Sequence, residues 1–270
     1  MPYALGIIGA GNMAEAIVRG IIARQVLRPS QIIAADTAAA RRELFTNELR
    51  VKSVEENATA AGDAETILLS VKPQHMAAAL AAIALVMSPK TLVISIAAGI
   101  SSAFIEKHLG ADKKWRVIRT MPNTPMLVGE GMVAMAAGAH ATRDDLAAAR
   151  KLFEAAADVI EVDEDKMDAV TAVSGSGPAY FFFLVEQMIR AAEELGMTPD
   201  QAKQLATKTA AGAAKMLATS ADPPDVLRRK VTSPGGTTES AITHMTTQNW
   251  PQITVDAIKA AQRRGRELGS

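Results

Sequence analysis

The sequence predicts an α/β protein, in which a doubly wound, mostly parallel sheet is followed by a smaller all-α domain. Short apolar runs alternate with helical patterns through the first half of the chain, as in parallel sheets with crossover helices. A glycine-rich turn joins the first apolar run to the first helical pattern. From about Asp165 onward only helical patterns follow. We therefore expect two domains, 1–163 and 164–270.

Apolar periodicity and turn residues predict each element of the first domain. The expected strands are 4–8, 31–35, 65–71, 91–96, 116–120, 131–137 and 159–162. The expected helices between them are 13–22, 38–49, 73–86, 101–109 and 142–156. Pro73 opens its helix because proline is favoured at the first helical position.

The second domain is expected to contain helices alone. A long apolar helix covers 166–195, and Gly175–Pro178 break or kink it because glycine and proline disfavour a helix interior. Thr198 and Pro199 suit the start of the next helix. Further helices are expected at 222–231, 237–246 and 251–268, the last ending near Gly269. Large side chains from Phe181 to Leu184 point in several directions, which predicts a subunit interface in this domain.

Composition excludes several classes of function. The 270 residues include 29 Lys and Arg and 29 Asp and Glu, so neither a nucleic-acid-binding surface nor a polybasic membrane patch is expected. The chain has no cysteine, which excludes disulfides and thiolate zinc sites and fits a reducing compartment. No apolar run reaches the ~20 residues that span a bilayer. We expect a cytoplasmic location, with no nucleic acid and no membrane as partner.

The first glycine-rich turn has the pattern of a dinucleotide-binding fingerprint. Gly9 permits the tight turn, Gly11 lets a pyrophosphate approach the backbone, and Ala14 allows close packing of helix on strand. The amides of the first helical turn favour the phosphate charge. We therefore expect a Rossmann-type domain in which Gly9, Gly11, Asn12 and Met13 bind the cofactor. The alternative is an ordinary glycine turn.

Asp36 ends the second expected strand. An acid at this place accepts the ribose hydroxyls of NAD and repels a 2′-phosphate, whereas a nearby arginine holds that phosphate. Arg41 and Arg42 follow closely, so the choice between NADH and NADPH stays open. A helix cap is the alternative role for Asp36.

Two later strand ends carry further candidates for cofactor binding. Ligands of open α/β sheets bind beyond the carboxyl ends of the strands, where the sequence places Val71, Lys72 and Pro73 and, in a stiff turn between two prolines, Asn123. The amide of Asn123 suits the nicotinamide amide. The alternatives are a solvated lysine and a purely structural turn.

A second glycine-rich turn, Ser233–Glu239, opens onto a helix. Its backbone amides can form an anion-binding nest. Because the first turn accounts for the phosphates, a substrate carboxylate is the expected guest here, and Thr238 adds a hydroxyl at the helix start. A simple helix cap is the alternative.

The catalytic residues of other enzyme classes are missing from the sequence. The four histidines are scattered, and neither a metal site nor a serine triad is indicated. No lysine lies between Asp168 and Gly196, where hydroxyacid dehydrogenases of similar layout carry a catalytic lysine. We therefore expect a substrate that needs no such acid or base.

These stretches together resemble the pyrroline-5-carboxylate reductase family over essentially the whole chain. The likeness lies in Gly6–Met13, in Val71–Gln74, in Arg119–Pro125, in Ser174–Tyr180 and, most specifically, in Val231–Ala241. The resemblance implies an NAD(P)H-dependent oxidoreductase of amino-acid biosynthesis that acts on a C=N bond. It would reduce 1-pyrroline-5-carboxylate to L-proline, the last step of proline biosynthesis, by hydride transfer to C5 of the protonated imine.

The resemblance also implies a helical dimerisation domain, and homodimers that assemble into decamers. It assigns Thr238 to a hydrogen bond near the ring nitrogen, as the catalytic residue. It assigns Ser233, Gly236, Thr237 and Thr238 to the substrate carboxylate. Members that prefer NADPH commonly lack an acid at the position of Asp36. Two alternative functions are a reductase of a related cyclic imine and a non-catalytic dinucleotide-binding protein.

Overall fold

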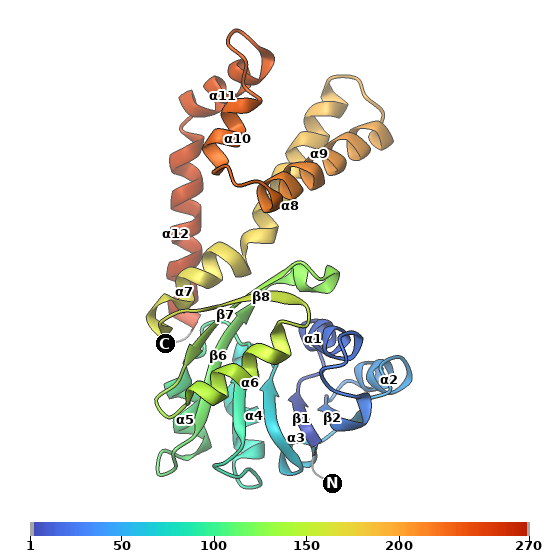
Figure 1. Cartoon of the computed structure of the whole chain (residues 1–270), viewed down its shortest axis with the longest axis vertical. Helices are drawn as coiled ribbons and strands as arrows, with labels where there is room; N and C mark the ends of the chain where they lie inside the picture. Colours follow the sequence, from blue (N-terminus) through green and yellow to red (C-terminus); the bar gives the residue numbers. More distant parts are fainter. Residues whose placement is uncertain (1–2, 269–270) are drawn as a thin grey trace. The chain divides into compact units, whose positions relative to one another are not determined.

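The chain folds as two compact units, seen in a computed structural model that describes residues 3–268 (Figure 1). Residues 3–176 and 261–268 form the first unit, and Gly177–Ala260 form the second. The division into functional domains between residues 163 and 164 stays a prediction. No helix among residues 3–268 combines the length and the apolar character that a bilayer crossing requires.

The first unit is built on an eight-stranded sheet with the order β3-β2-β1-β4-β5-β6-β7-β8. The strands are β1 (Tyr3–Ile8), β2 (Ile32–Ala35), β3 (Lys52–Val54), β4 (Ala64–Leu69), β5 (Leu92–Ser95), β6 (Arg116–Pro122), β7 (Gly131–Ala137) and β8 (Ala157–Glu161). Every neighbouring pair is parallel except β6 and β7, which are antiparallel. The predicted doubly wound, mostly parallel sheet is confirmed.

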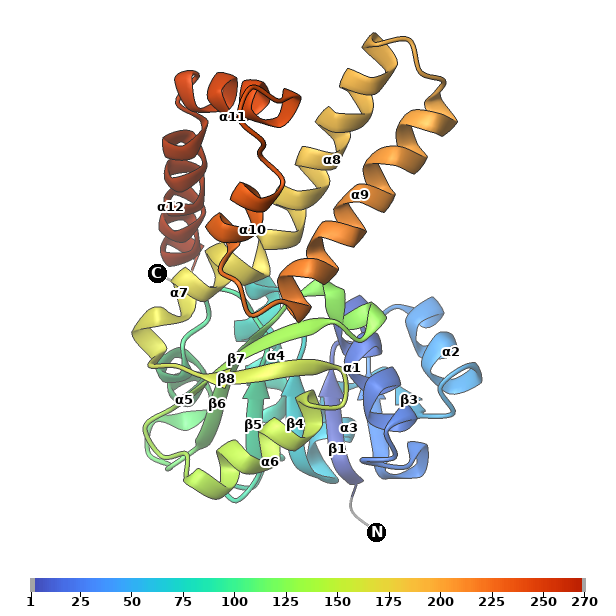
Figure 2. The ribbon, with the colours of Figure 1, turned by 45° about the horizontal axis from the view of Figure 1, so that its top comes forward.

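Helices cover both faces of this sheet (Figure 2). They are α1 (Asn12–Ala23), α2 (Ala39–Asn47), α3 (Asn57–Gly62), α4 (Met76–Ile83), α5 (Ser102–Gly110) and α6 (Arg143–Phe153). One core contains Ile17 of α1 and Phe153 of α6, while the other contains Leu80 of α4 and Ile105 of α5. The central strands are therefore buried on both sides, which explains their continuous apolar runs.

The sequence did not indicate β3 and α3. β3 is a three-residue edge strand, paired only with β2, and its Lys52 is exposed. α3 has six residues. Segments this short carry little periodicity, so the surrounding sheet rather than the local pattern determines their structure. The predicted helix from Pro73 also differs, because Pro73–His75 form a 3-10 turn and α4 begins at Met76.

The predicted break in the long apolar helix is confirmed. α7 (Met167–Val170) continues into one turn of π-helix at Thr171–Gly175, here called the π-turn, and α8 (Gly177–Glu194) follows. A Cβ atom on Gly175 would lie 2.6 Å from Cε of Met121. The π-turn therefore packs closely on the Met121 side chain at the end of β6.

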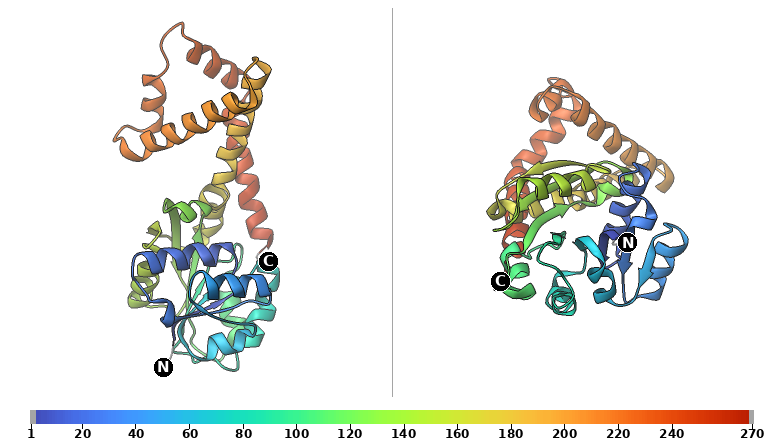
Figure 3. Two further views of the ribbon diagram at one scale, coloured as in Figure 1. Left: turned by 90° about the vertical axis from the view of Figure 1, so that its right-hand side faces the viewer. Right: turned by 60° about the horizontal axis from the view of Figure 1, so that its bottom comes forward.

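The second unit contains only helices (Figure 3). α8 packs beside α9 (Pro199–Thr219), and α10 (Pro224–Lys230) and α11 (Thr237–Thr247) follow. Thr198 caps α9 as predicted, accepting the N–H of Gln201 at 3.3 Å. α12 (Trp250–Leu268) begins in this unit, and its residues 261–268 belong to the first unit. Its expected end near Gly269 lies outside the described residues.

Candidate functional site

The first glycine-rich turn has the geometry that a diphosphate needs. Gly9 follows β1 with φ +93°, and a Cβ atom there would lie 2.9 Å from Cγ1 of Val71. Gly11 is the N-cap of α1, without a side-chain cap, and a Cβ atom on it would meet no atom within 4 Å. Open space thus lies at the start of a helix whose first amides lack intrahelical partners. The residues present fit the phosphates of a dinucleotide.

A cleft runs to both sides of this turn, along the carboxyl ends of the strands. Two adjoining cavities share Gly11, Ser70, Val71 and Lys72. The first cavity extends to Gly9, Ala35, Asp36, Thr37, Asn57, His75, Ala78 and Ala79. The second extends to Asn12, Met13, Pro73, Ile96, Ala97, Ala98, Met121 and Pro122. The structure therefore brings together all the predicted cofactor residues except Asn123.

Asp36 lies at the wall of the first cavity with both carboxylate oxygens engaged. Oδ2 accepts the N–H of Ala10 at 2.8 Å, and Oδ1 accepts the N–H of Ala38 at 2.8 Å. Ala38 is the residue that precedes α2. Asp36 therefore holds the glycine turn and the entry to α2 in addition to lining the cavity. Its contact with a ribose stays a prediction.

The two arginines that follow Asp36 are paired inside the protein. Arg41 donates from Nε to the carbonyl of Ala10 at 2.6 Å and from Nη2 to Glu15 at 2.9 Å. Partial burial raises the pKa of Glu15, but hydrogen bonds from Arg41 and Arg19 lower it more, so that pKa lies below its ordinary value. The carboxylate of Glu15 therefore stays ionised beside the glycine turn, and it competes with any phosphate for Arg41.

The ion pair of Arg42 is more exposed than that of Arg41. Its Nη1 donates to the carbonyls of Asp36 and Thr37 at 2.8 Å each. Its Nη2 lies 3.3 Å from Glu55, which is largely exposed. An exposed pair of this kind contributes little, so Arg42 is the arginine that an incoming phosphate can recruit more easily.

The side-chain amide of Asn123 is used within the protein. Its Oδ1 accepts the N–H of Met132 at 2.9 Å, and its Nδ2 donates to Oγ of Ser174 at 3.3 Å. It therefore ties the end of β6 to β7 and to the π-turn. A direct contact with nicotinamide stays a prediction, and the observed bonds favour the structural alternative for this turn.

The second glycine-rich turn lies in the second unit, between α10 and α11. Gly235 has φ +70° and donates its N–H to Oε2 of Glu239 at 2.7 Å. Gly236 donates its N–H to the carbonyl of Ser233 at 3.0 Å, and a Cβ atom on Gly236 would lie 2.9 Å from that oxygen. α11 begins at Thr237, so the first-turn amides of Thr237 and Thr238 are free of intrahelical partners. This arrangement fits a bound carboxylate.

Several cleft residues were missed in reading the sequence. Ile96, Ala97 and Ala98 follow β5, and Met121 stands near the end of β6. The rule that ligands lie beyond the carboxyl ends of strands could have found them, but none has a chemically distinctive side chain. No group of His, Cys, Asp and Glu side chains within residues 3–268 could hold a metal ion.

Comparisons with known proteins match the whole chain. The family model described as pyrroline-5-carboxylate reductase dimerisation matches residues 164–268, and that described as NADP oxidoreductase coenzyme F420-dependent matches residues 4–99. Pyrroline-5-carboxylate reductase of Pseudomonas aeruginosa is 42% identical over 98% of this chain and 96% of its own length. That of Arabidopsis thaliana is 37% identical over 98% of this chain and 95% of its own length.

Two solved structures are similar over nearly their whole length. A pyrroline-5-carboxylate reductase from Coxiella burnetii has a TM-score of 0.90 and 36% identity, with 100% of both chains covered. The pyrroline carboxylate reductase of Plasmodium falciparum, solved with NADP bound, has a TM-score of 0.88 and 26% identity, with 99% of this chain and 98% of that chain covered.

Proposed function

The chain belongs to the pyrroline-5-carboxylate reductase family, and from that premise we propose that it reduces 1-pyrroline-5-carboxylate to L-proline with NAD(P)H. This is the last step of proline biosynthesis. The observation that carries the proposal is the pair of glycine-rich turns, one open to a diphosphate at Gly11 and one with free amides for a carboxylate at Thr237 and Thr238. An enzyme that transfers a hydride from a dinucleotide to a small carboxylate substrate needs both binding sites.

The cofactor is bound, in our proposal, by Gly9, Gly11, Asn12 and Met13 at the diphosphate. Asp36 lines the ribose end of the cleft, and Val71, Lys72 and Pro73 line its middle and opposite wall. Reduced nicotinamide supplies the hydride when it is bound there. Asn123 contributes by fixing the wall through its bonds to Met132 and Ser174.

The substrate carboxylate is held, in the same proposal, by the Ser233 hydroxyl and by the backbone N–H groups of Thr237 and Thr238. Gly236 shapes this turn, because its own N–H is bonded to the Ser233 carbonyl. The hydroxyl oxygen of Thr238 accepts the N–H of the protonated imine and so fixes the ring. A protonated cyclic imine is already an electrophile at C5, so no general acid is needed. Orientation of the ring is then the main contribution of the protein, and such alignment is worth about 7–11 kcal/mol of barrier.

We also propose a homodimer formed through the helical domain 164–268, which matches the dimerisation model. Phe181, Phe182 and Phe183 are 65%, 64% and 65% exposed in the single chain. Consecutive helical residues point about 100° apart, so these rings cover more than half of the circumference of α8. A second copy of the chain supplies the apolar surface that covers them. Assembly of dimers into a decamer is the further step that we propose.

The reaction is proposed to take place in the cytoplasm, where a biosynthetic reductase meets its reduced cofactor. Cell fractionation with an antibody against the chain tests this location. Light scattering of the purified protein tests the assembly. A monomeric mass would contradict the proposal that a second copy of the chain covers the three phenylalanines.

A two-cofactor assay tests the function. Purified protein is mixed with 1-pyrroline-5-carboxylate and either NADPH or NADH, and the absorbance of the reduced nicotinamide is followed while proline is measured as product. We expect loss of absorbance with matching formation of proline. If neither NADPH nor NADH is oxidised, the proposal is wrong. Turnover of the six-membered cyclic imine alone would favour the related-imine reductase, and binding without turnover would favour a non-catalytic protein.

A further inference from the structure

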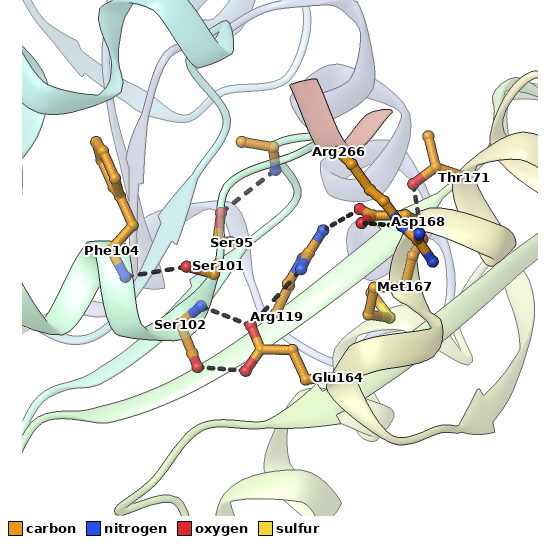
Figure 4. Close-up of polar contacts among 11 residues, drawn as sticks. Ser95, Ser101, Ser102, Phe104, Arg119, Glu164, Met167, Asp168, Thr171 and Arg266 are labelled. Atoms are coloured by element: carbon orange, nitrogen blue, oxygen red, sulfur yellow. Dashed lines mark hydrogen bonds and ion pairs between the residues drawn. The ribbon is translucent and has the colours of Figure 1, made fainter. Parts of the chain in front are cut away.

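Arg119 carries a positive charge into the covered face of the sheet. Its side chain is only 7% exposed, and it lies on β6 between Ser95 of β5 and Ala136 of β7. Figure 4 shows the guanidinium between two carboxylates. Nη2 lies 3.1 Å from Oδ1 of Asp168, and Nη1 lies 3.7 Å from Oε1 of Glu164. Pairing of this kind is what makes a buried charge tolerable.

Both carboxylates are also bound to other elements of the first unit. Glu164 accepts the N–H of Ser102 at 2.7 Å and its hydroxyl at 2.5 Å, at the start of α5. Oδ2 of Asp168 lies 3.9 Å from Nε of Arg266, near the end of α12. One side chain on β6 is therefore linked, through two acids, to α5, α7 and α12.

Stability alone is a weak explanation for this cluster. Replacement of a buried ion pair by packed apolar side chains is often neutral or stabilising. In some proteins a buried ion pair instead specifies one arrangement of the segments that carry it.

The same face of β6 continues from Arg119 to the wall of the cofactor cleft. Met121 follows by two residues, so its side chain emerges on the same face, and Met121 lines the cavity farther from Asp36. The π-turn lies directly against it, because a Cβ atom on Gly175 would be 2.6 Å from Cε of Met121. Asn123 binds Ser174 in the same turn at 3.3 Å. α7, which Arg119 holds through Asp168, runs straight into this π-turn.

We propose that Arg119 is a positioning residue for hydride transfer. Its ion pairs with Asp168 and Glu164 seat α7 and the π-turn on β6, and this seat fixes Met121 and the end of β6 at the nicotinamide end of the cleft. With the ribose end at Asp36 and the diphosphate at Gly11, the cavity lined by Met121 is the one left for the nicotinamide. The inference rests on the proposed function.

The test compares Arg119→Met, which keeps an unbranched apolar chain without the charge, with Arg119→Lys and Asp168→Asn. We expect Arg119→Met to lower kcat at least about tenfold, with the Kd of NADPH changed less than about threefold. The kinetic isotope effect with NADPH deuterated at the transferred position rises, because misalignment slows the hydride step itself.

Arg119→Lys restores part of kcat. The double variant Arg119→Met with Asp168→Asn is no worse than Arg119→Met alone, because both act on one interaction.

Arg143→Gln is the matched control. Arg143 pairs with Glu161 at 2.9 Å, but its side chain is 87% exposed, so kcat and the isotope effect stay as in the wild type. Amide hydrogen exchange gives a readout that needs no turnover, and we expect faster exchange at Thr171–Gly175 in Arg119→Met and unchanged exchange in Arg143→Gln.

Two outcomes would overturn the inference. One is a folded Arg119→Met with kcat and isotope effect unchanged. The other is a parallel loss of thermal stability, NADPH affinity and kcat in every variant, which indicates a structural role only. If Arg119→Met does not fold, Asp168→Asn and Arg119→Lys decide in the same way. Failure of the wild type to reduce 1-pyrroline-5-carboxylate would instead refute the proposed function. Hydrogen exchange at the π-turn would then still test whether the Arg119 ion pairs hold α7 and the π-turn on β6.

Discussion

The carboxylate of Asp36 accepts the N–H of Ala10 at 2.8 Å, so the residue that ends β2 also holds the glycine turn that follows β1. Its other oxygen accepts the N–H of Ala38. Each oxygen keeps a lone pair free, and Asp36 lines the cavity in which a ribose is proposed to lie. The acid is therefore both a backbone clamp and a candidate for cofactor selection.

Replacement of Asp36 by serine is expected to shift the cofactor preference toward NADPH. The carboxylate repels a 2′-phosphate, and the Nη2 of nearby Arg42, whose ion-pair partner Glu55 is exposed, can turn to that phosphate. We expect the ratio of kcat/KM for NADPH to that for NADH to rise about tenfold, which corresponds to ~1.4 kcal/mol. Steady-state kinetics with both cofactors measures it.

Asp36→Asn separates the two roles of the side chain. It keeps an oxygen that can accept the N–H of Ala10 but removes the charge. A shift in both variants assigns the selectivity to charge, and a shift in Asp36→Ser alone assigns it to the clamp. An unchanged ratio in both would mean that Asp36 serves only to hold the backbone.

Gly11→Ala is expected to separate cofactor binding from folding. The added methyl group meets no protein atom within 4 Å, so the melting temperature should stay within about 2 °C. The same methyl group projects into the space proposed for the diphosphate, and the Kd of NADPH should rise at least about tenfold. Calorimetric titration and thermal unfolding give the two numbers.

Gly62→Ala is the control, because Gly62 is the last residue of α3 and its added Cβ meets only Val86, at 3.8 Å. Its NADPH affinity should not change. An unchanged affinity of Gly11→Ala for NADPH would mean that the diphosphate does not bind at this turn.

The order of elements could be predicted because it depends on local patterns. β1, the glycine turn and α1 are encoded within one short stretch, and Gly175–Pro178 indicate a break in the long helix, although not its π-helical form. The edge strand β3 could not be predicted, since its pairing with β2 is decided by the sheet and not by its own three residues.

The partners of polar side chains in the candidate site could not be predicted. The sequence shows a polar Asn123 in a stiff turn, but the N–H of Met132 and the hydroxyl of Ser174 reach it only after the chain has folded. Likewise, Arg119 stands out as a charge in an apolar strand, while its partners Glu164 and Asp168 lie far along the chain. Local chemistry marks candidates, and tertiary contacts decide which atoms remain available.

Gly236→Ala is expected to damage the substrate site alone. A Cβ atom on Gly236 would lie 2.9 Å from the carbonyl oxygen of Ser233, which also accepts the N–H of Gly236. The turn must open, and KM for the cyclic imine substrate should rise about tenfold or more. The Kd of NADPH should match that of the wild type, since the diphosphate is assigned to the other turn. A loss of NADPH affinity equal to the change in KM would contradict this division of labour.

Phe182→Glu is expected to convert the dimer into a monomer. Phe182 is 64% exposed in the single chain, and a charge buried in an apolar interface without a partner is costly. Light scattering should report 28.4 kDa, the mass of a single chain. Leu85→Glu is the control, because Leu85 is 96% exposed in the first unit and should leave the dimer intact. A dimeric Phe182→Glu would place the interface elsewhere.

Thr238→Ala is expected to lower turnover while leaving cofactor affinity intact. The hydroxyl of Thr238 lies in the first turn of α11, two residues beyond the N-cap Gly236, and is proposed to hold the imine nitrogen. Its loss should reduce kcat about tenfold to a hundredfold, within the range for one misplaced contact to a reacting group. Thr246→Ala in the same helix is the matched control, because the Thr246 hydroxyl donates only to the carbonyl of Ile242, and its kcat should be unchanged. Equal losses of kcat and NADPH affinity in Thr238→Ala would contradict the assigned role, since a hydroxyl that touches only the substrate has no reason to affect the binding of cofactor.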